Sequence, residues 1–181
     1  MAIRYLFSIF LLAFLCFSCD PGKTSNREGQ KTKVLQVFLV RHAEKVDQSY
    51  DPELTPAGYV RAATLAQTLH SAEITQVHST DFIRTRKTAE PLAAINGLEV
   101  EIYDPSDLKA LSEKLLELGG RHLVVGHSNT TPRMVDLLGG DPGLDVIADE
   151  EYDRLYLVSV SRGGEVSTLL LRYGAAYIPP Y

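Results

Sequence analysis

Two histidines and two arginines have the side-chain chemistry of a phosphate-binding centre. Arg41 and His42 directly follow one short apolar run, and His127 directly follows another. Arg84 lies about one turn into a segment with helical spacing of its apolar residues. A guanidinium can hold a phosphate through two parallel hydrogen bonds, and an imidazole can act as nucleophile or proton carrier. Together, these four groups could bind a phosphoryl group without a metal ion.

The two apolar runs predict the strands that position the histidines. In Val34–Val40, six of seven residues are apolar and several are β-branched, which is typical of a central strand covered on both faces. His122–Gly126 is the second such run. Ligands of parallel sheets bind beyond the carboxyl ends of the strands, where His42 and His127 are expected. One strand-end histidine alone is more often structural, but two of them, one preceded by Arg41, favour a functional site.

Strands and helices alternate along the chain, which predicts the α/β class. We expect a three-layer α/β/α sandwich with a mainly parallel sheet, in which the last hairpin allows an antiparallel edge. The strand order cannot be read from the sequence. The predicted strands are 34–40, 74–79, 98–103, 122–126, 154–160 and 166–172, and the predicted helices lie at about 55–69, 81–96, 106–118 and 131–139.

Arg84 stands out because cations near a helix N-terminus oppose the helix dipole. Its position is explained if an anion lies between the guanidinium and the backbone N–H groups of that terminus. The neighbouring Arg86 and Lys87 are expected on a solvated face.

The first 18 residues have the pattern of an export signal. Arg4 precedes a nearly continuous apolar block, Tyr5–Phe17, which is too short to cross a bilayer comfortably as a permanent helix. Cys19 follows a small residue and precedes a polar stretch, so the segment resembles a bacterial lipoprotein signal with Cys19 lipidated. An uncleaved anchor and a secreted soluble form are the alternatives.

These observations divide the chain into a signal peptide (1–18), a lipidated cysteine with a flexible tether (19–33) and one domain (34–181). We expect an exported protein of the bacterial cell envelope, attached to the membrane by its N-terminal lipid. The net charge is −5 and there is no basic tail, so nucleic acid is not an expected partner. Cys16 and Cys19 are the only cysteines, so the domain has no thiol for catalysis, metal binding or disulfides.

Four motifs resemble the histidine phosphatase superfamily, in its phosphoglycerate-mutase-like branch 1, as a short member with little beyond the core. They are RHAEK (Arg41–Lys45), LTPAG (Leu54–Gly58), HSTDFIRTRKTAEPLA (His78–Ala93) and VVGHSN (Val124–Asn129). The resemblance implies that His42 is the nucleophile that becomes phosphohistidine. It also implies that Arg41 and Arg84 bind the phosphate, that His127 is the second pocket histidine, and that no cofactor is needed.

The chemistry of this arrangement is coherent. A neutral His42 attacks phosphorus in line, so its other ring nitrogen needs a hydrogen-bond partner. Arg41, Arg84 and a protonated His127 hold the equatorial oxygens. Water then attacks the phosphohistidine.

An alkoxide leaving group needs a proton donor, and two carboxylates are candidates. The family's acid usually follows the third strand, where Asp104 lies here, and Glu44 is the rival; either could be a plain loop residue. Asn129, next to Ser128 and His127, could bind the phosphate or cap the following helix. His70, His78 and His122 are interpreted as structural.

The expected function is a metal-independent phosphatase that acts on a small phosphorylated substrate or a phosphoprotein. A mutase is an alternative, although mutases of this family are longer, with insertions that form a lid. A metallohydrolase built from His42, His127, Asp104 and Glu44 is a third hypothesis, but the chain has no local ligand pair such as HxH. A non-catalytic phosphate-binding lipoprotein is the fourth.

Overall fold

The structure is a computed structural model that describes residues 33–179. The predicted signal peptide, the lipidated Cys19 and all but the last residue of the predicted tether lie outside the described residues, and these assignments stay predictions. Between residues 33 and 179, every helix is too short or too polar to cross a membrane.

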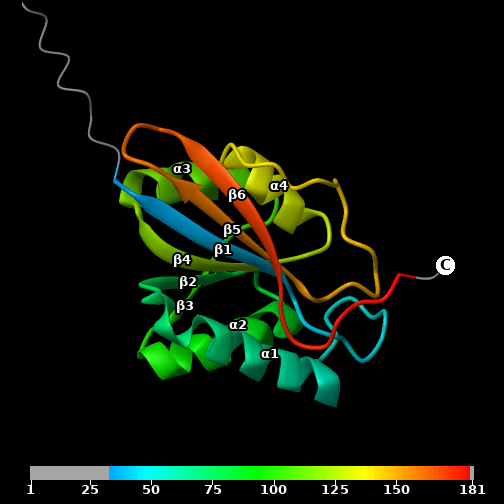
Figure 1. The fold of residues 1–181 in the computed structure, drawn as a ribbon. Coiled ribbons are helices and arrows are strands. Elements are labelled where there is room, and N and C mark those ends of the chain that lie inside the picture. Colours follow the sequence, from blue (N-terminus) through cyan, green and yellow to red (C-terminus); the bar gives the residue numbers. More distant parts are fainter. Residues whose placement is uncertain (1–32, 180–181) are drawn as a thin grey trace, which may run out of the picture.

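In the described part of the chain, one mixed sheet of six strands has the order β3-β2-β4-β1-β5-β6 (Figure 1). Strands β3, β2, β4 and β1 are parallel, β5 is antiparallel to β1, and β6 is antiparallel to β5. This confirms a mainly parallel sheet with an antiparallel edge. The strands are β1 (Leu35–Arg41), β2 (Gln76–Ser79), β3 (Val100–Ile102), β4 (Gly120–Gly126), β5 (Arg154–Val160) and β6 (Val166–Arg172).

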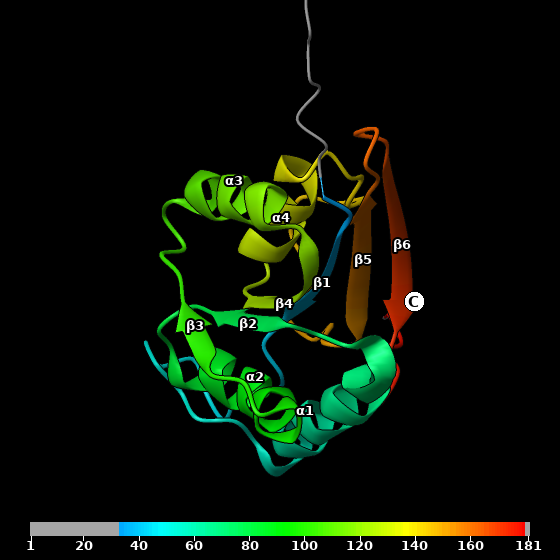
Figure 2. The same cartoon turned by 90° about the vertical axis from the view of Figure 1, so that its left-hand side faces the viewer.

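Helices cover both faces of the sheet, as Figure 2 shows, which confirms the predicted three layers. Helices α1 and α2 lie on one face, and α3 and α4 on the other. They are α1 (Pro56–Leu69), followed by a 3-10 turn (His70–Ala72), α2 (Ile83–Asn96), α3 (Leu108–Leu118) and α4 (Thr130–Leu137).

The alternating side chains of β1 explain why it is central. Leu35, Val37 and Leu39 pack with apolar residues of α3 and α4, whereas Val40 packs in the core formed with α1 and α2. All four are fully buried, and each contributes roughly 1.5–3 kcal/mol relative to an exposed position. Both faces of the strand therefore fix its place, and with it the position of the residues at its carboxyl end.

Candidate active site

The register of the central strands brings His42 and His127 together. Arg41, the last residue of β1, pairs with Gly126, the last residue of β4. The next residue of each strand therefore leaves the sheet at the same edge, and the backbone N–H of His42 donates to the carbonyl of Gly126 at 2.9 Å. The two imidazole rings are 5.6 Å apart, centroid to centroid, in an edge-on arrangement.

The same register brings Thr80 to this edge. Ser79, the last residue of β2, pairs with Val125 of β4, so Thr80 leaves the sheet beside His127. The segments that follow β1 and precede β5 (cyan and yellow to orange in Figure 1) lie at this edge as well. The site therefore lies where open parallel sheets bind ligands.

His42 has the tautomer that a nucleophile needs. Its Nδ1 lies 2.8 Å from the carbonyl oxygen of Ala43, so Nδ1 carries the hydrogen and the lone pair is on Nε2. The residue is only 3% exposed. Burial, with smaller contributions from the positive charges of Arg41 and Arg84, lowers the pKa of His42 to about 3. The imidazole is therefore neutral at neutral pH, and the predicted hydrogen-bond partner of Nδ1 is present.

Arg41 is held by the backbone of the loop before β5. Its Nη1 donates to the carbonyls of Ala148 at 2.7 Å and Asp149 at 3.0 Å, with Glu151 O at 3.4 Å, and its Cζ lies 4.4 Å from the ring centroid of Tyr152. Its Nε is buried without a hydrogen-bond partner. A buried, unpaired donor costs free energy, and a bound anion would relieve that cost.

Arg84 approaches from the first turn of α2. Its Nη2 lies 3.3 Å from Nδ1 of His127, and its Nη1 donates to the carbonyl of Tyr50 at 3.1 Å. The Cζ atom lies 4.5 Å from the ring centroid of Phe82. The structure thus brings together all four charged or titratable groups that the sequence singled out.

The expected anion between Arg84 and the start of α2 is the protein's own carboxylate. Oδ1 of Asp51 accepts a hydrogen bond from the backbone N–H of Ile83 at 2.7 Å and lies 3.7 Å from Nη1 of Arg84. Asp51 therefore supplies the negative charge that the position of Arg84 predicted. Arg86 and Lys87 pair with acidic neighbours on the solvated face, as predicted.

The surroundings of His127 favour the neutral ring at neutral pH, and the expectation that a protonated His127 holds the phosphoryl oxygens stays a prediction. Burial, followed by the positive charges of Arg84 and Arg41, lowers the pKa of His127 to about 4. Protonation would place a third positive charge beside two guanidinium groups. A bound phosphate dianion would reverse this balance and favour the charged ring.

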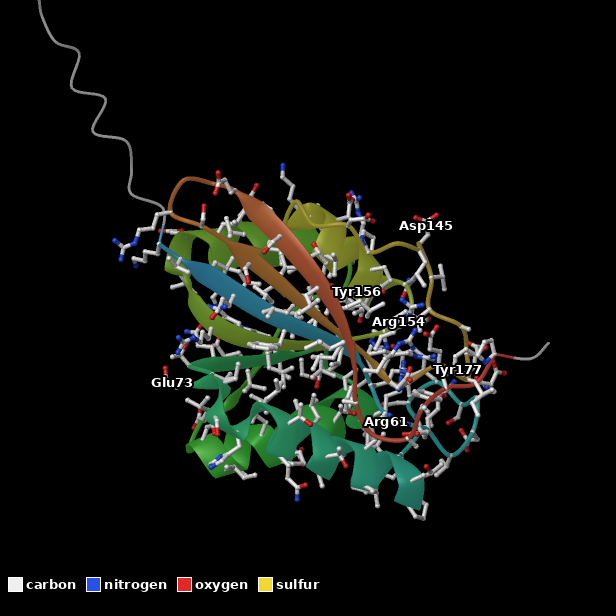
Figure 3. All side chains as sticks on the ribbon, in the orientation of Figure 1. Arg61, Glu73, Asp145, Arg154, Tyr156 and Tyr177 are labelled. Atoms are coloured by element: carbon white, nitrogen blue, oxygen red, sulfur yellow. The ribbon has the colours of Figure 1, made fainter. Side chains whose placement is uncertain are left out.

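Glu44 is tied to Arg61 of α1. The two carboxylate oxygens accept from Nε of Arg61 at 2.9 and 3.0 Å, and Nη2 lies 2.8 Å from Oε1. Arg61 also donates to the carbonyls of Tyr173 and Ala175, so it joins α1 to the C-terminal segment (Figure 3). Gly58 allows the start of α1 to lie against the backbone of Glu44, because a Cβ at position 58 would lie 2.3 Å from the carbonyl oxygen of Glu44. Glu44 therefore has a structural partner.

We expect Arg61→Met to lower the free energy of unfolding by about 3–5 kcal/mol, because the change leaves a carboxylate and two carbonyls unpaired. Arg61 is 5% exposed. Urea denaturation measures the change, and Arg133→Met, at a solvent-exposed ion pair with Asp136, is the matched control with an effect below about 0.5 kcal/mol. Equal effects of the two substitutions would contradict the structural role of Arg61.

Asp104 and Asn129 lie at the periphery. The Asp104 carboxylate accepts from the backbone N–H and the hydroxyl of Ser106, and these bonds hold its pKa below the usual value. This environment favours the charged form, whereas a general acid must carry a proton. Asn129 is exposed, its side chain makes no capping hydrogen bond, and it lines an open groove with Arg133 and Asp145. Its role in binding stays a prediction.

The donor set of the alternative metallohydrolase is not assembled. Glu44 is occupied by Arg61, and Asp104 by Ser106. Among residues 33–179, no group of three or more His, Cys, Asp or Glu side chains could hold a metal ion.

Two other histidines form a buried pair within the sheet. Nε2 of His78 lies 3.1 Å from Nδ1 of His122, and Nε2 of His122 lies 2.7 Å from the carbonyl of Gly119. Both rings are 1% exposed. These contacts agree with the structural interpretation of both residues, and His70 is exposed at the end of α1.

Thr80 and Tyr152 belong to the site, but the sequence pattern did not single them out. Thr80 lies inside the quoted motif HSTDFIRTRKTAEPLA, and its position after a strand was the available signal. Tyr152 is the aromatic residue of an otherwise acidic loop, which is a weaker signal. The backbone carbonyls that hold Arg41 carry no residue-type signal at all.

Comparisons with known proteins point to one family. Residues 37–107 match the family model described as histidine phosphatase superfamily (branch 1). A protein of Photorhabdus laumondii named "probable phosphoglycerate mutase GpmB" is 33% identical over 129 residues, which cover 67% of this chain and 58% of the relative. The protein of the same name from Yersinia enterocolitica is 37% identical over 91 residues, covering 46% of this chain and 41% of the relative. The chain thus spans about half the length of these curated relatives.

Solved structures share the fold. The protein histidine phosphatase SixA, complexed with tungstate, superposes with a TM-score of 0.59 at 22% identity, covering 77% of this chain and 96% of that one. A phosphoglycerate mutase from Bacillus anthracis gives a TM-score of 0.60 at 15% identity, covering 78% and 93%. At these identities the likeness shows the fold.

The fold and the cluster at the strand ends define an α/β sandwich with two histidines and two arginines gathered at its carboxyl edge. The family match and the relatives identify the family: the chain belongs to the histidine phosphatase superfamily.

Proposed function

We propose that this protein is a metal-independent phosphatase that acts through a phosphohistidine on His42. The observation that carries the proposal is the meeting, at one sheet edge, of a neutral histidine with its lone pair on Nε2 and two guanidinium groups. A neutral imidazole is nucleophilic, and fixed cations stabilise the negative charge on a transferring phosphoryl group.

In the proposed reaction, Nε2 of His42 attacks phosphorus and the bond to the leaving atom breaks. The leaving atom takes a proton, and the phosphoryl group stays on Nε2. Water then attacks phosphorus, the N–P bond breaks, and phosphate leaves. Arg41, with its unpaired Nε, and Arg84 hold the phosphoryl oxygens in both steps.

Two substrate classes fit this chemistry. A phosphomonoester needs a proton donor for its alkoxide, but the Ser106 contacts favour the charged form of Asp104, and Glu44 is tied to Arg61. The leaving group of a phosphoramidate is a nitrogen base, which depends less on a proton donor than an alkoxide does. A phosphohistidine protein is therefore a substrate class alongside small phosphate esters. The fold likeness to SixA, a protein histidine phosphatase, supports including that class.

A mutase activity is the second candidate, and the name of the curated relatives favours it. Phosphoryl transfer between two positions of one substrate requires the phosphohistidine to survive until the product turns over. Rapid hydrolysis of the phosphoenzyme by water would therefore separate a phosphatase from a mutase.

The test is hydrolysis of a generic aryl phosphate in excess chelator. We expect the rate to be unchanged by the chelator, because the proposed centre uses only protein groups. Loss of activity on chelation, restored by added divalent metal, would favour a metallohydrolase. Absence of turnover of aryl phosphates, sugar phosphates and phosphoproteins under every condition would favour a non-catalytic phosphate-binding protein.

A further inference from the structure

We propose that Thr80 is a positioning residue that fixes which ring nitrogen of His127 carries the proton. The inference rests on the proposed function for its kinetic consequence, but the tautomer itself can be measured whether or not the protein turns over a substrate.

The two contacts of the ring allow only one arrangement of hydrogens. Nη2 of Arg84 lies 3.3 Å from Nδ1 of His127, and a guanidinium can only donate, so Nδ1 must present its lone pair. Nε2 then carries the hydrogen of the neutral ring. It lies 2.9 Å from Oγ1 of Thr80, which accepts that hydrogen bond.

The Thr80 hydroxyl can accept a hydrogen bond from the ring because its own hydrogen is donated to Thr85. Oγ1 of Thr80 lies 3.0 Å from Oγ1 of Thr85, and the Thr85 hydroxyl donates to the carbonyl of Thr80 at 2.9 Å. Both threonines are fully buried, so water does not compete for these bonds. In this row of hydrogen bonds, each hydroxyl donates away from His127, and the last acceptor is the backbone carbonyl of Thr80.

The opposite tautomer would break this pattern. If Thr80 donated to Nε2, the hydrogen of the neutral ring would move to Nδ1 and face the donor of Arg84. Two donors would then meet at 3.3 Å with no acceptor between them. The Arg84 donor and the threonine pair therefore favour the same tautomer, with the free lone pair on the Arg84 side, and Thr80 supplies the acceptor for the hydrogen on Nε2.

The consequence is that a proton arriving on His127 has one place to bind, Nδ1. The charged or titratable groups that face the ring are Arg84 of α2, Arg41 at the end of β1 and His42 directly after it, with Asp51 behind Arg84. The two arginines oppose protonation in the free protein. A tetrahedral dianion between them removes that opposition, so anion binding should be coupled to proton uptake at Nδ1.

Nitrogen NMR of protein labelled at its histidines tests the proposal directly, because the ring shifts distinguish the two neutral tautomers from the charged ring. In the full chain at neutral pH, we expect His127 to carry its proton on Nε2. Saturating tungstate, used as a tetrahedral dianion, should add a proton at Nδ1. Thr80→Val removes the acceptor for the hydrogen on Nε2 and leaves only the longer contact with Arg84, so we expect a mixture of tautomers. Thr80→Ser, which keeps the hydroxyl, should restore the single form.

Kinetics on an aryl phosphate gives the second readout. We expect Thr80→Val to lower kcat/KM about tenfold, the size of one lost hydrogen bond, with Thr80→Ser within about twofold of the parent. Thr68→Val removes an exposed hydroxyl that bonds within α1 and should change neither readout.

Either of two results would overturn the inference: the Nδ1–H tautomer of His127 in the parent protein, or an unchanged tautomer in Thr80→Val. If the tautomers behave as expected and no substrate is turned over, the positioning role stands and the proposed function fails. If Thr80→Val does not fold, the Thr80→Ser protein and the tautomer of the parent still decide the question.

Discussion

Replacement of His42 by alanine should abolish hydrolysis of an aryl phosphate, with a loss of about 10⁴-fold or more in kcat, because no other group replaces a missing nucleophile. His42 is buried and neutral, and its lone pair is on Nε2. Each of these properties makes the ring reactive toward phosphorus. Steady-state kinetics of His42→Ala with the same substrate measures the effect.

The control for this substitution is His70→Ala, which removes an exposed histidine at the end of α1. It should leave kcat within about twofold of the parent, as expected for a surface change. Circular dichroism and thermal melting of both variants check that the fold is intact. A well-folded His42→Ala protein that keeps more than about a tenth of the parent rate would show that another residue attacks the substrate.

Arg84→Gln should lower kcat/KM by about 10²–10³-fold, which is the usual effect of removing one fixed donor from a centre that stabilises transition-state charge. The structure places this guanidinium against His127 and holds it by the carbonyl of Tyr50 and the face of Phe82. Glutamine keeps a polar side chain of intermediate length but removes the charge and the paired donors.

Arg86→Gln is the matched control, because Arg86 lies two residues away in α2 and pairs with Asp81 on the solvated face. It should change kcat/KM by less than about twofold. If Arg84→Gln and Arg86→Gln had equal effects, the basic character of α2 as a whole, rather than the position of Arg84, would explain the requirement for charge.

The main elements and the four central side chains could be predicted from the sequence for a physical reason. An apolar run that ends abruptly in a polar pair is typical of a strand buried on both faces, and β1 has this pattern. Parallel strands place their carboxyl ends on one edge. Because β1 and β4 are adjacent and in register, Arg41 and Gly126 pair, and His42 and His127 meet.

The partners of these residues could not be predicted in the same way. Arg41 is held by carbonyls that lie more than 100 residues away along the chain, and every residue type has a carbonyl. Asp51 reaches the start of α2 from a loop whose path the residue pattern does not fix. The link from Glu44 to Arg61 likewise depends on the packing of α1 against the C-terminal segment.

The charge of His127 illustrates a different limit. Its residue type and position were predicted, but its protonation depends on the distances to Arg84 and Arg41 and on its burial. Those quantities exist only in the folded structure. The strand order of the sheet was equally inaccessible, because the pattern of apolar residues specifies each strand and not its neighbour.

The central claim is that the phosphoryl group passes through a covalent bond to His42. Rapid acid-free quenching after a brief pulse of substrate, followed by proteolysis and mass spectrometry, measures that bond directly. We expect a phosphoryl group on the peptide that contains His42, stable to base and labile to acid, and none in His42→Ala. Turnover at the full rate with no phosphopeptide at any time point, or with phosphate on a different residue, would contradict the account.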